Sequence, residues 1–129
     1  MQLTSSLFYD VYDNDKWNFA VRFSPDVYGL NFVSGTSNPN RILELYGVNS
    51  DAGTVVDEFS ITASLSFGGR QKFINEPKRI YAGSYRTNFT GSLLEETDIK
   101  LGSVRYWTSY LNDEVVQAHS RDPENFGVL

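Results

Sequence analysis

The sequence contains no cysteine and a single histidine, and both shortages limit the chemistry that the chain can perform. Without cysteine there is no disulfide framework, no thiol nucleophile and no cysteine-based zinc site. Any mechanism that needs an imidazole would have to use His119. The N-terminus shows no basic segment followed by an apolar run, so we expect no signal peptide, and no stretch is long and apolar enough to cross a bilayer.

Basic residues are also scarce, with 11 Lys and Arg against 16 Asp and Glu and a formal net charge of −5. Nucleic acids and anionic membranes bind clustered Lys and Arg, so neither is an expected partner. The 129 residues suit one domain with a core of its own. Aromatic residues are plentiful, with nine Phe, eight Tyr and two Trp, and such side chains favour pleated sheets.

Several segments alternate apolar and polar residues, as half-buried β-strands do. In KWNFAVRF the alternation predicts one inward row and places Arg22 on the other side; the row is Trp17, Phe19, Val21 and Phe23. In VVDEFSITASLSF it predicts a second inward row, made of Phe59, Ile61, Ala63 and Leu65. Further strands are expected at residues 41–47, 78–85 and 99–107, the last bulged at Gly102. Turn-rich segments separate them, and GGRQKFINEP (68–77) is interpreted as one such break.

The segment LNDEVVQAH predicts a short closing helix after the strands. Asn112 is a good N-cap, and the acidic residues that follow it suit the first turn of a helix. Leu111 and Val116 have the spacing of a hydrophobic staple across the cap. Pro123 prevents much continuation, and residues 120–129 are interpreted as a terminal arm.

The C-terminal half of the chain resembles the end of laminin-G-like, concanavalin A-like jelly rolls. That family has a strand ending in Gly, a loop with F-x-G-x-L/I, a V-R-x-W/Y strand and a short L-(S/N)-D-E-x-(I/V) helix. The matching parts are Ile80 to Gly83, Phe89 to Leu93, Val104 to Trp107 and Leu111 to Val115. Upstream, KWNFAVRF and ILELYGVNSDAGTVV are similar to strands of the family. Family domains are usually longer, so the resemblance implies that strands are missing or come from a neighbouring segment.

Catalysis is not expected. A histidine near a helix C-terminus is electrostatically at ease, so His119 is interpreted as structural. Jelly-roll glycosidases of the resembled family place carboxylates at alternate positions of one strand, on one face and within reach of a glycosidic bond. Here the adjacent acids of VVDEF point to opposite faces, and those of LLEETD fall in a loop.

Two kinds of binding site remain as hypotheses. The acidic run YDVYDNDKW offers Asp13 and Asp15, and Asp51 in another loop could join them, because hard oxygens suit Ca²⁺. The alternative is a solvated acidic turn. A sugar site needs an exposed aromatic ring beside hydrogen-bonding groups. Two loops offer such residues, or are ordinary loops: Asp26 and Tyr28 in one, and Tyr85, Arg86 and Asn88 in the other.

We therefore expect an all-β, antiparallel two-sheet jelly-roll sandwich with one short C-terminal helix, forming a single domain over residues 1–129. The resemblance implies a non-catalytic binding or structural module in a larger extracellular, cell-surface or virion protein, such as a bacterial or phage appendage. Its partner would be a glycan, a protein, a neighbouring domain or another copy of the chain. The alternatives are a purely architectural spacer and a glycan hydrolase or lyase.

Overall fold

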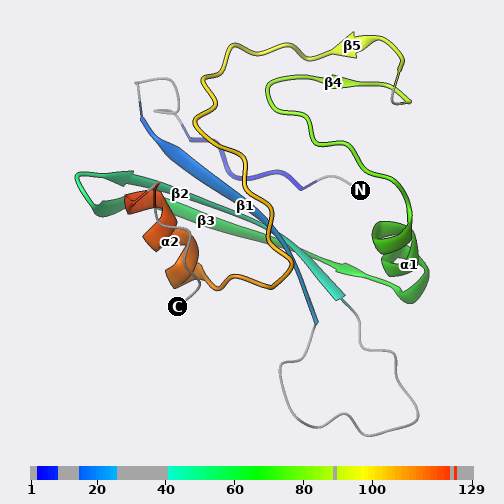
Figure 1. Cartoon of the computed structure of the whole chain (residues 1–129), viewed down its shortest axis with the longest axis horizontal. Helices are drawn as coiled ribbons and strands as arrows, with labels where there is room; N and C mark the ends of the chain where they lie inside the picture. The colour runs from blue at the N-terminus through cyan, green and yellow to red at the C-terminus, as the bar shows by residue number, and fades with distance from the viewer. Residues whose placement is uncertain (1–2, 9–14, 26–40, 89, 123, 125–129) are drawn as a thin grey trace, which may run out of the picture.

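The computed structural model describes residues 3–8, 15–25, 41–88, 90–122 and 124. Its elements in chain order are β1 (Trp17–Pro25), β2 (Arg41–Asp51), β3 (Thr54–Leu65), α1 (Phe67–Asn75), β4 (Tyr85–Arg86), β5 (Leu93–Leu94) and α2 (Asp113–Arg121). Strands β1, β2 and β3 form an antiparallel sheet in that order, and β4 pairs with β5 in a small separate hairpin (Figure 1). The chain is thus mostly β, with small sheets.

The three long strands occur where the alternation predicts them, and their register defines two faces. Phe19 lies opposite Gly47, which lies opposite Phe59, so these three positions share one face of the sheet. We call it the aromatic face; it includes Trp17, Phe19, Val21, Phe23, Leu43, Leu45, Gly47, Phe59, Ile61, Ala63 and Leu65, with Asn49 and Asp57 beside Trp17 at one end. The other side, the helix face, carries Ala20, Arg22, Glu44, Tyr46, Val48, Glu58 and Ser60.

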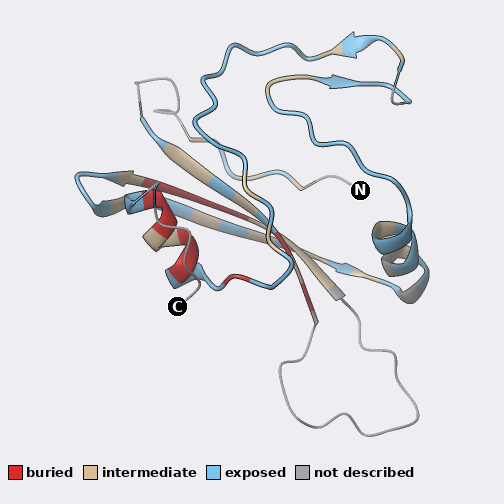
Figure 2. Ribbon diagram, viewed as in Figure 1, coloured by how far each residue is buried: buried red, intermediate tan, exposed pale blue. Residues whose placement is uncertain are grey.

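The closing helix confirms its predicted start and packs on the helix face. The Asn112 side chain accepts a hydrogen bond from the Val115 amide at 3.0 Å, which caps α2. The core consists of side chains from β2 and from α2 with its leading residue, namely Tyr46, Val48, Leu111, Val115 and Val116 (Figure 2). At the other end of α2, the Ser120 carbonyl accepts from Lys16 and Ser50. The helix runs to Arg121, so it enters the segment interpreted as a terminal arm.

The row of β1 predicted to point inward is only partly covered. Phe19 is 59% exposed and Val21 is 69% exposed, whereas Arg22 on the opposite side is buried. The prediction of the alternation itself is right, but the best-covered side of β1 is the polar one. The physical reason is that α2 docks on the helix face, where Tyr46 and Val48 of the central strand meet it.

Two other expectations are wrong. A second helix, α1, occupies most of the predicted break, with Ser66 as its N-cap and the Glu76 amide bonded to the Lys72 carbonyl. Of the residues expected in strands at 78–85 and 99–107, only Tyr85, the first residue of β4, lies in a strand of the described chain. Alternation alone does not make a strand, because a strand also needs a neighbouring backbone to bond with.

Candidate functional site

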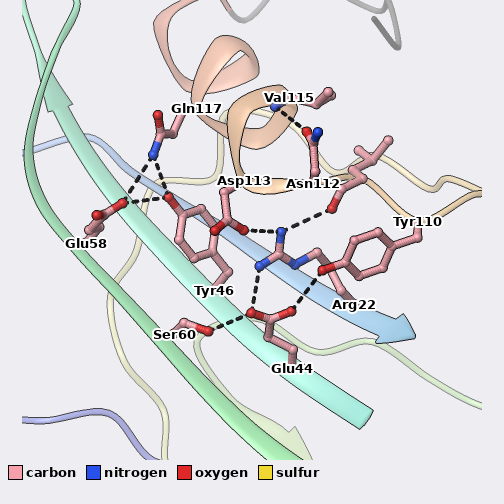
Figure 3. Close-up of polar contacts among 11 residues, drawn as sticks. Arg22, Glu44, Tyr46, Glu58, Ser60, Tyr110, Asn112, Asp113, Val115 and Gln117 are labelled. Carbon is pink, nitrogen blue, oxygen red and sulfur yellow. Dashed lines mark hydrogen bonds and ion pairs between the residues drawn. The ribbon is translucent and has the colours of Figure 1, made fainter. Parts of the chain in front are cut away.

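The most organised polar cluster in the described chain centres on Arg22, between the sheet and α2 (Figure 3). The Arg22 side chain is 4% exposed and forms ion pairs with Glu44 at 2.8 Å and with Asp113 at 2.5 Å. Its Nη1 also donates to the Leu111 carbonyl at 3.1 Å. One guanidinium therefore joins strand β1, strand β2 and the first turn of α2.

Aromatic rings cover the guanidinium. Its central carbon lies 4.8 Å from the ring centroid of Tyr46 and 5.3 Å from that of Tyr110, which is cation–π distance. Burial by itself would lower the pKa of Arg22, but the hydrogen bond to Asp113 and the charge of Glu44 outweigh it and raise that pKa. The arginine therefore stays charged at every pH at which the fold exists.

The carboxylates around this arginine are held by further donors. Glu44 accepts from Ser60 Oγ at 2.6 Å and from Tyr110 Oη at 3.2 Å. Tyr46 Oη donates to Glu58 at 2.8 Å.

Gln117 Nε2 of α2 donates to Tyr46 Oη at 3.0 Å and to Glu58 at 3.2 Å. Burial raises the pKa of Tyr46, and the nearby Glu58 carboxylate raises it further. The phenol is therefore neutral at neutral pH and can serve as both donor and acceptor.

This arrangement fastens α2 to the sheet rather than exposing reactive groups. Glu44 has its charge matched by Arg22, and Glu58 is occupied by donors from Tyr46 and Gln117. Beside the cluster a shallow depression lies at the start of α2, lined by Tyr110, Asn112, Asp113 and Glu114. We interpret the cluster as an electrostatic clamp that holds the helix in register.

The structure places the predicted sugar-binding residues of the second loop on one exposed hairpin. Tyr85 and Arg86 form β4, and Asn88 follows in the turn with a φ of 48°. Arg86 Nη1 donates to the Gly91 carbonyl across the turn at 3.3 Å, and the Tyr85 ring is 44% exposed. Asp26 and Tyr28, the other pair, lie outside the described residues.

The predicted calcium ligands are placed only in part. Asp13 lies outside the described residues, Asp15 accepts a hydrogen bond from Asn49 Nδ2 at 3.0 Å, and Asp51 is exposed at the end of β2. Within the described ranges, no three His, Cys, Asp or Glu side chains come together in a group that could hold a metal ion.

The single histidine lies on the side of α2 that faces the core. The imidazole of His119 is buried and stacks on Trp107, with 5.3 Å between ring centroids and 13° between planes. Trp107 itself packs against the core from the loop before the helix, although the sequence placed it in a strand.

The aromatic face is a surface that the sequence did not identify as a site. Phe8 packs on Trp17 and Phe59 at one end, with centroid distances of 5.1 and 5.3 Å. Phe73 of α1 stacks on Phe23 at the other end, at 5.0 Å. Phe19 and Val21 lie between these two ends and remain exposed.

A glycine keeps the centre of the aromatic face flat. A Cβ at Gly47 would meet the ring of Phe59 and would lie 3.2 Å from the ring of Phe19, so a side chain there would push both rings away. The pattern that could have revealed this face is the combination of two apolar rows with a glycine at the matching position of β2.

Comparison of the chain with protein-family models, with curated proteins and with solved structures finds no significant match. Neither helix in the described ranges is long and apolar enough to span a membrane.

Proposed function

We propose that this chain is a non-catalytic binding and structural module that uses the aromatic face to hold a protein partner. In this proposal the β1–β3 sheet is one layer of a jelly-roll sandwich of the laminin-G-like, concanavalin A-like kind, within a larger cell-surface or virion protein. The observation that carries the proposal is the row of exposed apolar side chains, Phe19 and Val21, on a sheet whose other face is partly covered by α2.

The chemistry of the aromatic face favours a protein over a sugar. A sugar site combines a flat ring with groups that read hydroxyls, such as amides or carboxylates. In the three central rows of the face, which contain Phe19, Val21 and Phe23, no side chain is charged or carries an amide, and aliphatic residues such as Leu45 and Ile61 stand among the rings. Such a face suits the apolar centre of a protein interface.

A glycan site on the β4–β5 hairpin is the second candidate. Tyr85 is exposed there, and Arg86 and Asn88 follow it within the same turn, so a ring and polar groups are close in sequence and on one hairpin. This site would not involve the aromatic face. The two candidates therefore respond to different substitutions.

A glycan array with three proteins separates these functions. The wild type is compared with Phe19→Ser on the aromatic face and with Tyr85→Ser on the hairpin. If the aromatic face binds a protein, Phe19→Ser should abolish none of the glycan signals that the wild type gives. A signal abolished only by Tyr85→Ser assigns the glycan to the hairpin, and one abolished only by Phe19→Ser contradicts our assignment of the aromatic face. Release of reducing ends from any bound glycan would contradict a non-catalytic role.

A further inference from the structure

The two ends of the aromatic face are covered by rings that are held in different ways. At one end Phe73 stacks on Phe23, and Phe73 belongs to α1, which follows β3 after a single residue. At the other end the cover is Phe8, which lies in residues 3–8, a segment that forms neither helix nor strand (the blue trace before β1 in Figure 1). The ring of α1 is tied to the sheet by the chain itself, whereas the ring of Phe8 depends on its own contacts.

The contacts of Phe8 with the sheet are made by its ring. Its centroid lies 5.1 Å from that of Trp17 and 5.3 Å from that of Phe59, and the side chain is half-buried. The preceding residue, Leu7, is 75% exposed. One aromatic side chain is therefore seated on the aromatic face while its apolar neighbour points into water.

The backbone of residues 3–8 adds little to this attachment. No backbone hydrogen bond joins the segment to another described residue. Its one side-chain hydrogen bond within the described chain is local, because Ser5 Oγ donates to the Ser6 carbonyl at 2.8 Å. The segment is held on the sheet chiefly by the ring of Phe8.

A cover attached in this way is displaceable. Half-burial of a phenylalanine side chain favours the covered arrangement by on the order of tenfold. The entropy lost when the backbone of residues 3–8 is fixed works against it. Strands β1, β2 and β3, by contrast, are joined by continuous antiparallel pairing. The ring of Phe8 can therefore leave the sheet while the strands stay paired.

The position of Phe8 matters because a partner of the aromatic face needs the same rings. Trp17 stacks beside Phe19 with 5.8 Å between centroids and 8° between planes, and Phe59 lies 6.3 Å from Phe19. The exposed Phe19 is thus the immediate neighbour of both rings that Phe8 covers. A partner that covers Phe19 and reaches the next ring in either direction meets Phe8.

We propose that residues 3–8 are a strap that closes one end of the aromatic face through Phe8 and opens without unfolding the sheet. The strap competes with the protein partner of that face. With a closed-to-open ratio of about ten, it weakens the apparent affinity for the partner about tenfold, because only the open fraction can bind. This inference rests on the proposed function, since it describes the regulation of the same face.

Fluorine NMR of the full chain labelled with fluorotryptophan is the first test, because the sequence contains only two tryptophans. We expect Phe8→Ala to shift the resonance of Trp17. The resonance of Trp107, which stacks on His119 on the other side of the sheet, should stay in place. Leu7→Ala is the matched control, since it truncates the adjacent, 75% exposed side chain and should shift neither resonance. Trp107→Phe assigns the two signals.

Binding of the apolar dye anilinonaphthalene sulfonate measures the competition, with the dye in place of a partner. We expect Phe8→Ala to bind the dye about tenfold more tightly than the wild type, and Leu7→Ala to bind it as the wild type does. Adding Phe19→Ser to Phe8→Ala should remove the gain, because it replaces the ring beside the opened end. Circular dichroism checks that the variants keep the sheet.

Several outcomes would overturn the strap. An unmoved Trp17 resonance in Phe8→Ala would mean that the ring of Phe8 does not sit there. An unchanged dye affinity in Phe8→Ala, an equal gain in Leu7→Ala, or a gain that survives Phe19→Ser would mean that Phe8 does not compete for the aromatic face. Loss of the sheet in Phe8→Ala would make Phe8 part of the folding core.

A measurement on the wild type tests the opening without any substitution. In a urea titration the Trp17 resonance should move at concentrations below those that unfold the sheet, as followed by circular dichroism. Movement of both signals together would show that Phe8 leaves only when the sheet unfolds, and it would overturn the proposal. None of these outcomes changes the glycan-array result, so failure of the strap and failure of the proposed function are distinguishable.

Discussion

Replacing Arg22 with methionine tests the clamp between the sheet and α2 most directly. Methionine keeps much of the length and apolar volume of the side chain but removes the charge and every donor. Loss of one partner from a buried ion pair typically costs 3–5 kcal/mol, because the other charge stays buried without its counterion. In Arg22→Met the carboxylate of Glu44, whose side chain is 13% exposed, would stay buried without its counterion.

The expected loss lies at the lower end of that range. Glu44 keeps donors from Ser60 and Tyr110, and the Asp113 side chain is 59% exposed and can return to water. We therefore expect Arg22→Met to lower the free energy of unfolding by about 3 kcal/mol. With a urea slope of about 2 kcal/mol per molar, the unfolding midpoint falls by about 1.5 M.

Equilibrium urea unfolding followed by circular dichroism measures this loss, and two further variants sharpen it. Arg86→Met makes the same substitution on the exposed hairpin and should change the free energy of unfolding by less than about 0.5 kcal/mol. In Arg22→Met/Glu44→Leu both charges are gone, so most of the lost stability should return. A loss below about 0.5 kcal/mol in Arg22→Met, or a double variant less stable than the single one, would refute the clamp.

Four further predictions follow from single features. The raised pKa of Tyr46 means that the folded state holds the phenol proton more tightly than the unfolded state does. The associated stability is therefore present below pH 10 and is lost as the pH rises through the folded pKa. Tyr46→Phe should flatten this alkaline decline in urea titrations, whereas Tyr106→Phe, at an 84% exposed position, should not. Asn112→Ala removes the cap of α2 and should cost about 1 kcal/mol in the same assay, and an unchanged midpoint would contradict the role of the cap. Gly47→Ala forces a methyl group against the rings of the aromatic face and should cost about 1–3 kcal/mol of unfolding free energy, with altered near-ultraviolet dichroism; an unperturbed spectrum would contradict the close approach. Millimolar calcium should leave the melting temperature unchanged, because one Asp15 oxygen already accepts an internal hydrogen bond, and a rise of several degrees would instead reveal a metal site.

The three long strands and the capped end of α2 are the parts that local pattern could predict. Alternation is a property of each strand alone, and the cap depends only on residues from Asn112 to Val115. Both signals lie within a few residues of the structure they describe.

The errors have a common physical origin in contacts between distant residues. Alternation at 78–85 and 99–107 is real, but in the described chain it finds almost no strand partner. The Gly pair suggested a break, yet Ser66 caps a helix there. Which face of β1 is covered depends on where α2 docks, and the contact of Arg22 with Leu111 spans 89 positions of the sequence. No local pattern of β1 contains that information.

The long stretch of sequence between the sheet and α2 has a consequence for synthesis on the ribosome. The three-stranded sheet is complete in sequence at Leu65, but its covering helix ends only at Arg121. At 5–20 residues per second, the nascent chain carries an uncovered Tyr46 and Val48 for roughly 3–11 s. During this interval a chaperone or a neighbouring nascent chain can reach both sides of the sheet, so premature termination before Asn112 should yield insoluble fragments.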